Sequence, residues 1–85
     1  MITSGTDKKG DALVALELTE QGIINLELNS KVYLKYGESI KRSVLETLSE
    51  LGVQSANIKI DDYGALDFVI RARVETAIVR ALGGK

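Results

Sequence analysis

The sequence predicts an α+β domain: a two-layer sandwich in which two helices cover a four-stranded, mostly antiparallel sheet in the order ββαββα. Three observations favour this class. Apolar and polar residues alternate in four short segments, two further segments place apolar residues at helical spacing, and glycine-containing turns separate most of these segments. Strands that are apolar mainly on one face need a cover, which two amphipathic helices supply.

The first half of the chain supplies two strands and a helix. Alternation runs through residues 12–18 and again through residues 23–28, and the loop between them contains Gly22. Two such runs around a short glycine-containing loop predict an antiparallel hairpin. Apolar residues then follow helical spacing over residues 38–51, and Gly52 stands where a left-handed C-terminal cap is expected.

The second half repeats this order. Residues 53–60 predict a third strand, residues 61–64 a turn, residues 65–71 a fourth strand, and residues 74–82 the second helix. The whole stretch 65–82 also fits one long helix. The strand is preferred because the first part of this stretch follows period two. The residues expected in one common core are Leu16, Leu26, Ile40, Val44, Leu48, Ile58, Phe68 and Ile78.

The two ends of the chain suggest its organisation. Residues 1–11 are mostly polar and predict a mobile N-terminal arm, followed by a single domain over residues 12–85. The arm carries Lys8 and Lys9 but no long apolar stretch follows, so it does not resemble a signal peptide. No run approaches the roughly 20 apolar residues of a membrane span. We therefore expect a cytoplasmic protein without a membrane partner.

Composition excludes several classes of function. The 85 residues contain no Cys and no His, which removes thiolate nucleophiles, the usual zinc ligands and the commonest general base. The net charge is −1, and one Phe, three Tyr and no Trp provide no stacking platform, so nucleic-acid binding is not expected. We expect no catalytic residue and no metal site, and therefore a binding protein rather than an enzyme.

Two pairs of charged residues remain as candidates. Asp61 and Asp62 are adjacent, so their side chains diverge, and a turn is favoured over an acid–base or metal site. Arg71 and Arg73 share a face if the fourth strand extends to them, an arrangement that suits gripping a phosphate or a partner's carboxylate. Snorkelling or salt-bridged arginines are an equal alternative.

The C-terminal half carries a more specific signal. The segment 62–67 reads Asp-Tyr-Gly-Ala-Leu-Asp, residues 71–73 read Arg-Ala-Arg, and Arg80 precedes Ala81. This pattern resembles the acyl carrier protein (gamma subunit) family of citrate lyase, with the same order and spacing from about Gly5 to Ala81. Within it, Gly64, Asp67, Arg71 and Arg73 are candidates for a structural or partner-binding motif, with Asp67 expected to pair with one of the two arginines or with a backbone N–H.

The resemblance implies a non-catalytic subunit that carries an acetyl or citryl thioester. In that family a phosphoribosyl-dephospho-CoA prosthetic group is joined by a phosphodiester to a serine of the N-terminal segment, and a transferase attaches it. The implied partners are the alpha subunit, which exchanges acetyl for citrate, and the beta subunit, which cleaves the citryl thioester. A swinging prosthetic arm needs an exposed attachment point, which the N-terminal segment is placed to offer.

Lys9 occupies the position that matches the modified serine, because Gly5-Thr6-Asp7-Lys8-Lys9-Gly10-Asp11 aligns with the family's segment without a gap. An amine cannot form the phosphodiester, and the nearby hydroxyls are those of Ser4 and Thr6. Three hypotheses follow: a carrier with a displaced attachment residue, a carrier-like scaffold or regulator that has lost the arm, and an unrelated small enzyme.

Overall fold

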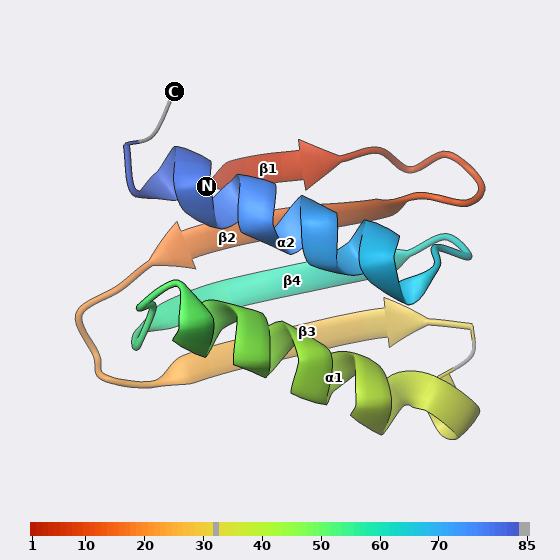
Figure 1. The fold of residues 1–85 in the computed structure, drawn as a ribbon, viewed down its shortest axis with the longest axis horizontal. Helices are drawn as coiled ribbons and strands as arrows, with labels where there is room; N and C mark the ends of the chain where they lie inside the picture. Colours follow the sequence, from red (N-terminus) through yellow and green to blue (C-terminus); the bar gives the residue numbers. More distant parts are fainter. Residues whose placement is uncertain (32, 84–85) are drawn as a thin grey trace.

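The computed structural model describes residues 1–31 and 33–83, and within them four strands form one sheet that two helices cover on one face (Figure 1). The strands lie in the order β1-β2-β4-β3. Strand β4 pairs antiparallel with β2 and parallel with β3, and β1 pairs antiparallel with β2. The elements in chain order are β1 (Ile2–Gly5), β2 (Ala12–Leu18), β3 (Ile24–Ser30), α1 (Tyr33–Glu50), β4 (Ala56–Asp62) and α2 (Asp67–Ala81).

The predicted α+β class, with a mostly antiparallel sheet under two helices, is confirmed, but the element order is βββαβα rather than ββαββα. Helix α1 begins at Tyr33, five residues before the predicted start, and contains Gly37, which is buried. Burial of this face against the sheet outweighs the low helix propensity of glycine.

The predicted hairpin of residues 12–18 and 23–28 is wrong, because β2 and β3 are not neighbours. Strand β4 lies between them, and its residues Ala56, Ile58 and Ile60 are all buried. A strand with apolar residues this strongly buried is most stable in the middle of a sheet, with a partner on each side. Helix α1 then serves as the crossover connection that parallel neighbours such as β3 and β4 require.

The predicted fourth strand over residues 65–71 is also wrong, since helix α2 covers residues 67–81. The alternative of one long helix over residues 65–82 agrees better with the observed helix. Ile70, Val74, Ala77 and Ile78 form the buried face of α2 at helical spacing, whereas Leu66 and Phe68 are exposed. A strand directly after β4 would also find both sides of β4 occupied by β2 and β3.

The segment expected to be a mobile arm contains strand β1, which pairs with β2 from Ile2 opposite Leu16 to Gly5 opposite Leu13. Helix α2 holds this short edge strand as well, because Arg80 donates a hydrogen bond to the carbonyl oxygen of Thr3 over 2.9 Å. The expectation of an unstructured segment is therefore wrong for residues 2–5. The mobility of the loop that follows stays a prediction.

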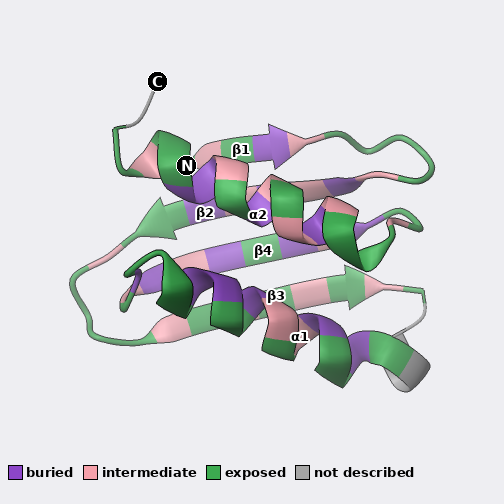
Figure 2. Cartoon of the chain, in the orientation of Figure 1, coloured by how far each residue is buried: buried purple, intermediate pink, exposed green. Residues whose placement is uncertain are grey.

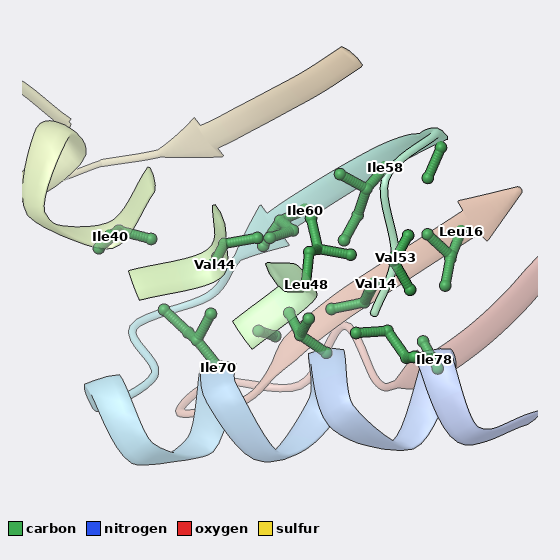
Figure 3. Packing of buried hydrophobic residues seen from close by; sticks show 14 residues of the cluster. Val14, Leu16, Ile40, Val44, Leu48, Val53, Ile58, Ile60, Ile70 and Ile78 are labelled. Carbon is green, nitrogen blue, oxygen red and sulfur yellow. The ribbon is translucent and has the colours of Figure 1, made fainter. Parts of the chain in front are cut away.

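The core lies between the helices and the sheet (Figure 3). Most of the predicted core residues are buried there, from both helices and from β2 and β4: Leu16, Ile40, Val44, Leu48, Ile58 and Ile78. Leu26 is partly buried against them. Phe68 is the error, because it is 69% exposed on the first turn of α2. Exposed positions follow the outer faces of the helices and the loops (Figure 2).

The opposite face of the sheet is polar. Asn57 on β4 donates a hydrogen bond to Glu17 on β2 and accepts one from Asn25 on β3, at 3.1 and 2.8 Å. Two residues further along β4, on the same face, Lys59 forms an ion pair with Glu27 of β3 at 3.8 Å. These polar side chains pair across the strands on a face that is exposed to water. The apolar face of the sheet is therefore the one that the helices cover.

Candidate functional site

Three connections meet at one end of the sheet, where β1, β3 and β4 all finish (Figure 1). They are the loop 6–11 between β1 and β2, the connection from β3 to α1, and the loop 63–66 between β4 and α2. Lys9, which from the sequence is expected at the place of the family's modified serine, is exposed in the first of these loops. The loop that contains Lys9 and the segment 62–67 are therefore brought to the same end of the molecule.

Asp11 fixes the base of loop 6–11. Its carboxylate accepts hydrogen bonds from Nε and Nη2 of Arg73 at 2.9 and 3.1 Å. It also accepts from the backbone N–H and the hydroxyl of Thr6, at 3.1 and 2.7 Å, and from the N–H of Ala12 at 2.8 Å. The Asp11 side chain is only 14% exposed. A carboxylate with this many donors holds both ends of the loop to helix α2.

The same contacts shift the ionisation of both partners. The hydrogen bonds from Arg73, and after them those from Thr6 and Ala12, hold the pKa of Asp11 well below its usual range. Asp11 in turn raises the pKa of Arg73 above its ordinary value. The pair therefore stays charged throughout the neutral pH range.

The two substitute hydroxyls, Ser4 and Thr6, are both engaged in the fold. Ser4 lies within strand β1 and is 3% exposed. The hydroxyl of Thr6 donates to Asp11 and accepts from the backbone N–H of Lys8 at 3.3 Å. Modifying either residue requires breaking the edge of the sheet or the base of the loop, whereas Lys9 is exposed.

Asp62 shapes the neighbouring loop and confirms the turn interpretation of this carboxylate. One of its oxygens accepts from the backbone N–H groups of Gly64 and Ala65 at 3.0 and 2.8 Å, and the other accepts from the hydroxyl of Ser30 at 2.8 Å. Gly64 has φ 91°, a left-handed conformation that disfavours residues with a side chain. The glycine in the family-like segment is thus required by the turn.

Backbone hydrogen bonds join the two loops directly. The N–H of Gly10 donates to the carbonyl of Tyr63 at 2.7 Å, and the N–H of Tyr63 donates to the carbonyl of Asp11 at 3.0 Å. The position of Lys9 is therefore tied to the segment 62–67 on one side and, through Asp11, to helix α2 on the other.

Arg71 and Arg73 do not share a face, because they lie on a helix and not on a strand. Arg71 binds Glu50 of α1 at 2.7 Å and Glu75 of α2 at 3.1 Å, and these carboxylates, Glu75 first, raise the pKa of Arg71. Arg73 binds Asp11. The salt-bridged alternative is the correct one, and the grip on a phosphate by both arginines is wrong.

Asp67 is exposed in the first turn of α2, and the two arginines expected as its partners bind other carboxylates. A carboxylate at a helix N-terminus interacts favourably with the helix dipole. The expected pairing of Asp67 with one of these arginines is therefore wrong, whereas its pairing with a backbone N–H and its role in partner binding stay predictions.

An open groove of about 1080 Å³ lies between these loops and the start of α1. Its apolar lining comes mainly from Tyr36, Ile40, Tyr63, Ala65, Leu66 and Phe68. Lys9 and Lys31 contribute amines, and Asp7, Asp62 and Asp67 contribute carboxylates. Leu66 and Phe68 are 63% and 69% exposed, so both present apolar surface at the groove.

The groove does not have the ligands of a metal centre. Within residues 1–31 and 33–83, no group of three or more His, Cys, Asp or Glu side chains lies close enough to hold a metal ion. In the same part of the chain, no helix combines the length and apolar character needed to cross a membrane.

Neither the role of Asp11 nor the surface groove was predicted from the sequence. Asp11 lies 62 residues from Arg73 in the chain, so no local spacing reveals their pairing. A weak signal did exist, since Asp11 directly precedes a strand after a glycine, where an acceptor for loop N–H groups is common.

Comparison with known proteins agrees with the resemblance seen in the residues. The family model of the malonate decarboxylase delta subunit (MdcD) matches residues 1–81. The citrate lyase acyl carrier protein of Pectobacterium atrosepticum is 45% identical over 82 residues, which cover 96% of this chain and 84% of that protein. The citrate lyase acyl carrier protein of Fusobacterium nucleatum is 40% identical over 78 residues, 92% of this chain and 83% of its own length. This chain therefore belongs to the acyl carrier protein family that includes the malonate decarboxylase delta subunit and the citrate lyase acyl carrier proteins.

Proposed function

We propose that this chain is the acyl-carrier-like gamma subunit of a cytoplasmic citrate-lyase-type complex, and that it performs no catalysis itself. The observation that carries this proposal is the family match over residues 1–81, which includes both the loop with Lys9 and the segment 62–67 beside it. Its partners are then the alpha and beta subunits of that complex. The exposed end of the sheet is the surface best suited to meet them.

A separate question is whether the prosthetic group is attached to this chain. The residues of the N-terminal segment favour a chain that does not form the phosphodiester. A phosphoribosyl-dephospho-CoA group needs a hydroxyl, and the matching position holds the amine of Lys9. Ser4 is buried and the Thr6 hydroxyl is bonded to Asp11. Holding either hydroxyl in a transferase site requires opening this structure, at roughly 1 kcal/mol or more for each residue that must be reordered. A carrier-like scaffold or regulator of the lyase subunits is therefore favoured over a loaded carrier.

Binding to the partner subunits is tested with purified proteins. The chain is mixed with the alpha and beta subunits of a citrate-lyase-type complex from its own host, and the mixture is separated by size exclusion. Co-elution with at least one subunit is expected. Separate elution from both would contradict the proposal. The double change Leu66→Asp and Phe68→Asp, at two exposed positions, serves to locate the contact on the groove.

Loading of the arm is tested with the transferase and its prosthetic-group precursor, and the product is measured by intact mass. The wild-type chain is expected to stay unmodified, and Lys9→Ser is expected to gain the mass of the prosthetic group. Lys8→Ser is the matched control, because it offers a hydroxyl one residue away from the family position. A wild-type peptide with the adduct on Ser4 or Thr6 would make the chain a true carrier.

A further inference from the structure

The groove has an amine at its edge. Lys9 and Gly10 from the loop 6–11 line it together with the apolar residues Ala65, Leu66 and Phe68. Lys8, the preceding residue, is also exposed but does not line the groove. The two neighbouring amines therefore differ in their access to the apolar lining of the groove.

The loop presents this amine from an ordered base. Asp11 is bound to Arg73 and Thr6, the N–H of Asp11 donates to the carbonyl of Lys8 at 3.0 Å, and Gly10 is bound to Tyr63. Hydrogen bonds therefore connect the residues on both sides of Lys9 to the rest of the fold. A nucleophile held near a bound reactant gains rate because the entropy of bringing the two together is largely lost beforehand.

The lining indicates what kind of group the groove accepts. Its walls are mainly apolar, and an alkyl chain lying there gains about 25 cal/mol for each Å² removed from water. The charged residues of the lining include both signs, with Lys9 and Lys31 against Asp7, Asp62 and Asp67. This mixture of charges favours an uncharged, apolar group over a strongly anionic or cationic one.

We propose that Lys9 and the groove form an acyl-acceptor site for thioesters with an apolar acyl chain. The chain of the acyl group lies against Leu66 and Phe68, which brings its carbonyl carbon to the Lys9 amine. The neutral amine attacks this carbon, a C–N bond forms, the C–S bond breaks, and the amine proton leaves with the departing thiolate as a thiol. The product is an amide on Nζ of Lys9. This proposal does not depend on the lyase partners.

The test uses the isolated full chain and octanoyl-CoA, with acetyl-CoA as the short-chain comparison. Acylated positions are measured by mass spectrometry after digestion with a protease that cleaves at acidic residues, so that Lys8 and Lys9 are separated by fragmentation. We expect octanoylation of Lys9 to be at least ~10-fold faster than that of Lys8, since positioning near a reactant commonly gives far larger gains. With acetyl-CoA, the two lysines are expected to react at similar rates.

Two variants isolate the cause. Phe68→Asp alters an exposed side chain of the groove and is expected to reduce octanoylation of Lys9 to the rate of Lys8. Lys9→Arg keeps the charge but removes the acylatable amine, and is expected to leave Lys8 slow. Equal rates at Lys8 and Lys9 in the wild-type chain, or the same preference for Lys9 with acetyl-CoA, would overturn the proposal without using any variant. Because no lyase subunit or transferase is present, this failure is distinct from a failure of the proposed function.

Discussion

The base and the apex of the loop 6–11 differ sharply, although only a few residues separate them. At the base, Gly5 packs against the backbone of Ala12 and the aliphatic part of Arg73, and Asp11 binds Thr6 and Arg73. At the apex, Lys8 and Lys9 are exposed, and a Cβ added to Gly10 would meet no atom within 4 Å. The base is therefore part of the fold, and the apex is a surface that this fold presents.

This contrast predicts which substitutions alter the fold and which alter only the exposed part of the loop. A substitution of Lys9 changes an exposed side chain at the apex of the loop. Replacing Asp11 or Arg73 would change the structure that presents the loop. Substitutions at the base are thus expected to affect stability, and substitutions at the apex are expected to affect what the chain binds or carries.

The largest effect is expected from Gly5→Ala. Gly5 has φ 86°, and an added Cβ would lie 1.8 Å from the carbonyl oxygen of Ala12, so the backbone must move. We expect a loss of at least ~3 kcal/mol in the free energy of unfolding, from the left-handed strain and the clash together. Gly10→Ala is the matched control, with φ 88° and open space, and should cost about 1 kcal/mol. Urea denaturation of both variants measures the difference, and equal losses would show that the base is not packed as described.

The next largest effect is expected from Asp11→Asn, and it depends on pH. Because the folded-state pKa of Asp11 is lowered, its charge stabilises the fold above the unfolded-state pKa, about 4, and this contribution is lost as the pH falls further toward the folded-state pKa. The melting temperature of the variant should be several degrees below that of the wild type at pH 7. The gap should narrow progressively below about pH 4. A gap that is constant from pH 7 to pH 3 would contradict the ion-pair role.

A smaller effect is the difference in stability that we expect between the alanine variants of Arg71 and Arg73, the two arginines compared on α2. Arg73→Ala removes two donors to a carboxylate that is 14% exposed, whereas Arg71→Ala removes contacts to carboxylates that are 58% and 48% exposed. Exposed ion pairs contribute little because water and salt screen them. Thermal melts should therefore show a clear decrease for Arg73→Ala and almost none for Arg71→Ala. The reverse order would place the structural contact between the two helices instead of at the loop.

The smallest effect on stability is expected from Asp67→Ala. Asp67 is exposed, and its favourable interaction with the N-terminus of α2 is of the order of 0.5 kcal/mol. Because Asp67 lines the groove, binding to the lyase subunits is the sharper measurement for this residue. A loss of more than about 1 kcal/mol in a denaturant titration would show a structural contact of the kind expected for charge-assisted hydrogen bonds.

The pattern of residues was sufficient to predict the α+β class and most of the core. Leu16, Val44 and Leu48 are buried as expected, because period two and helical spacing report directly which side of an element meets the core. The same patterns failed at Leu66, Phe68 and Ile70, where three alternating apolar residues fit a strand. Only Ile70 is buried there, as part of a helical face that continues to Ile78.

The sequence by itself determined the family segment, the absence of Cys and His, and the amine at position 9, since these follow from residue identity alone. Tertiary structure decided which strands are neighbours, because pairing energies act between segments that are distant in the chain, and β4 entered between β2 and β3. It also decided that Asp11 meets Arg73 and that Lys9, Leu66 and Phe68 line one groove. Both arrangements depend on the folded path of the chain, which no local period encodes.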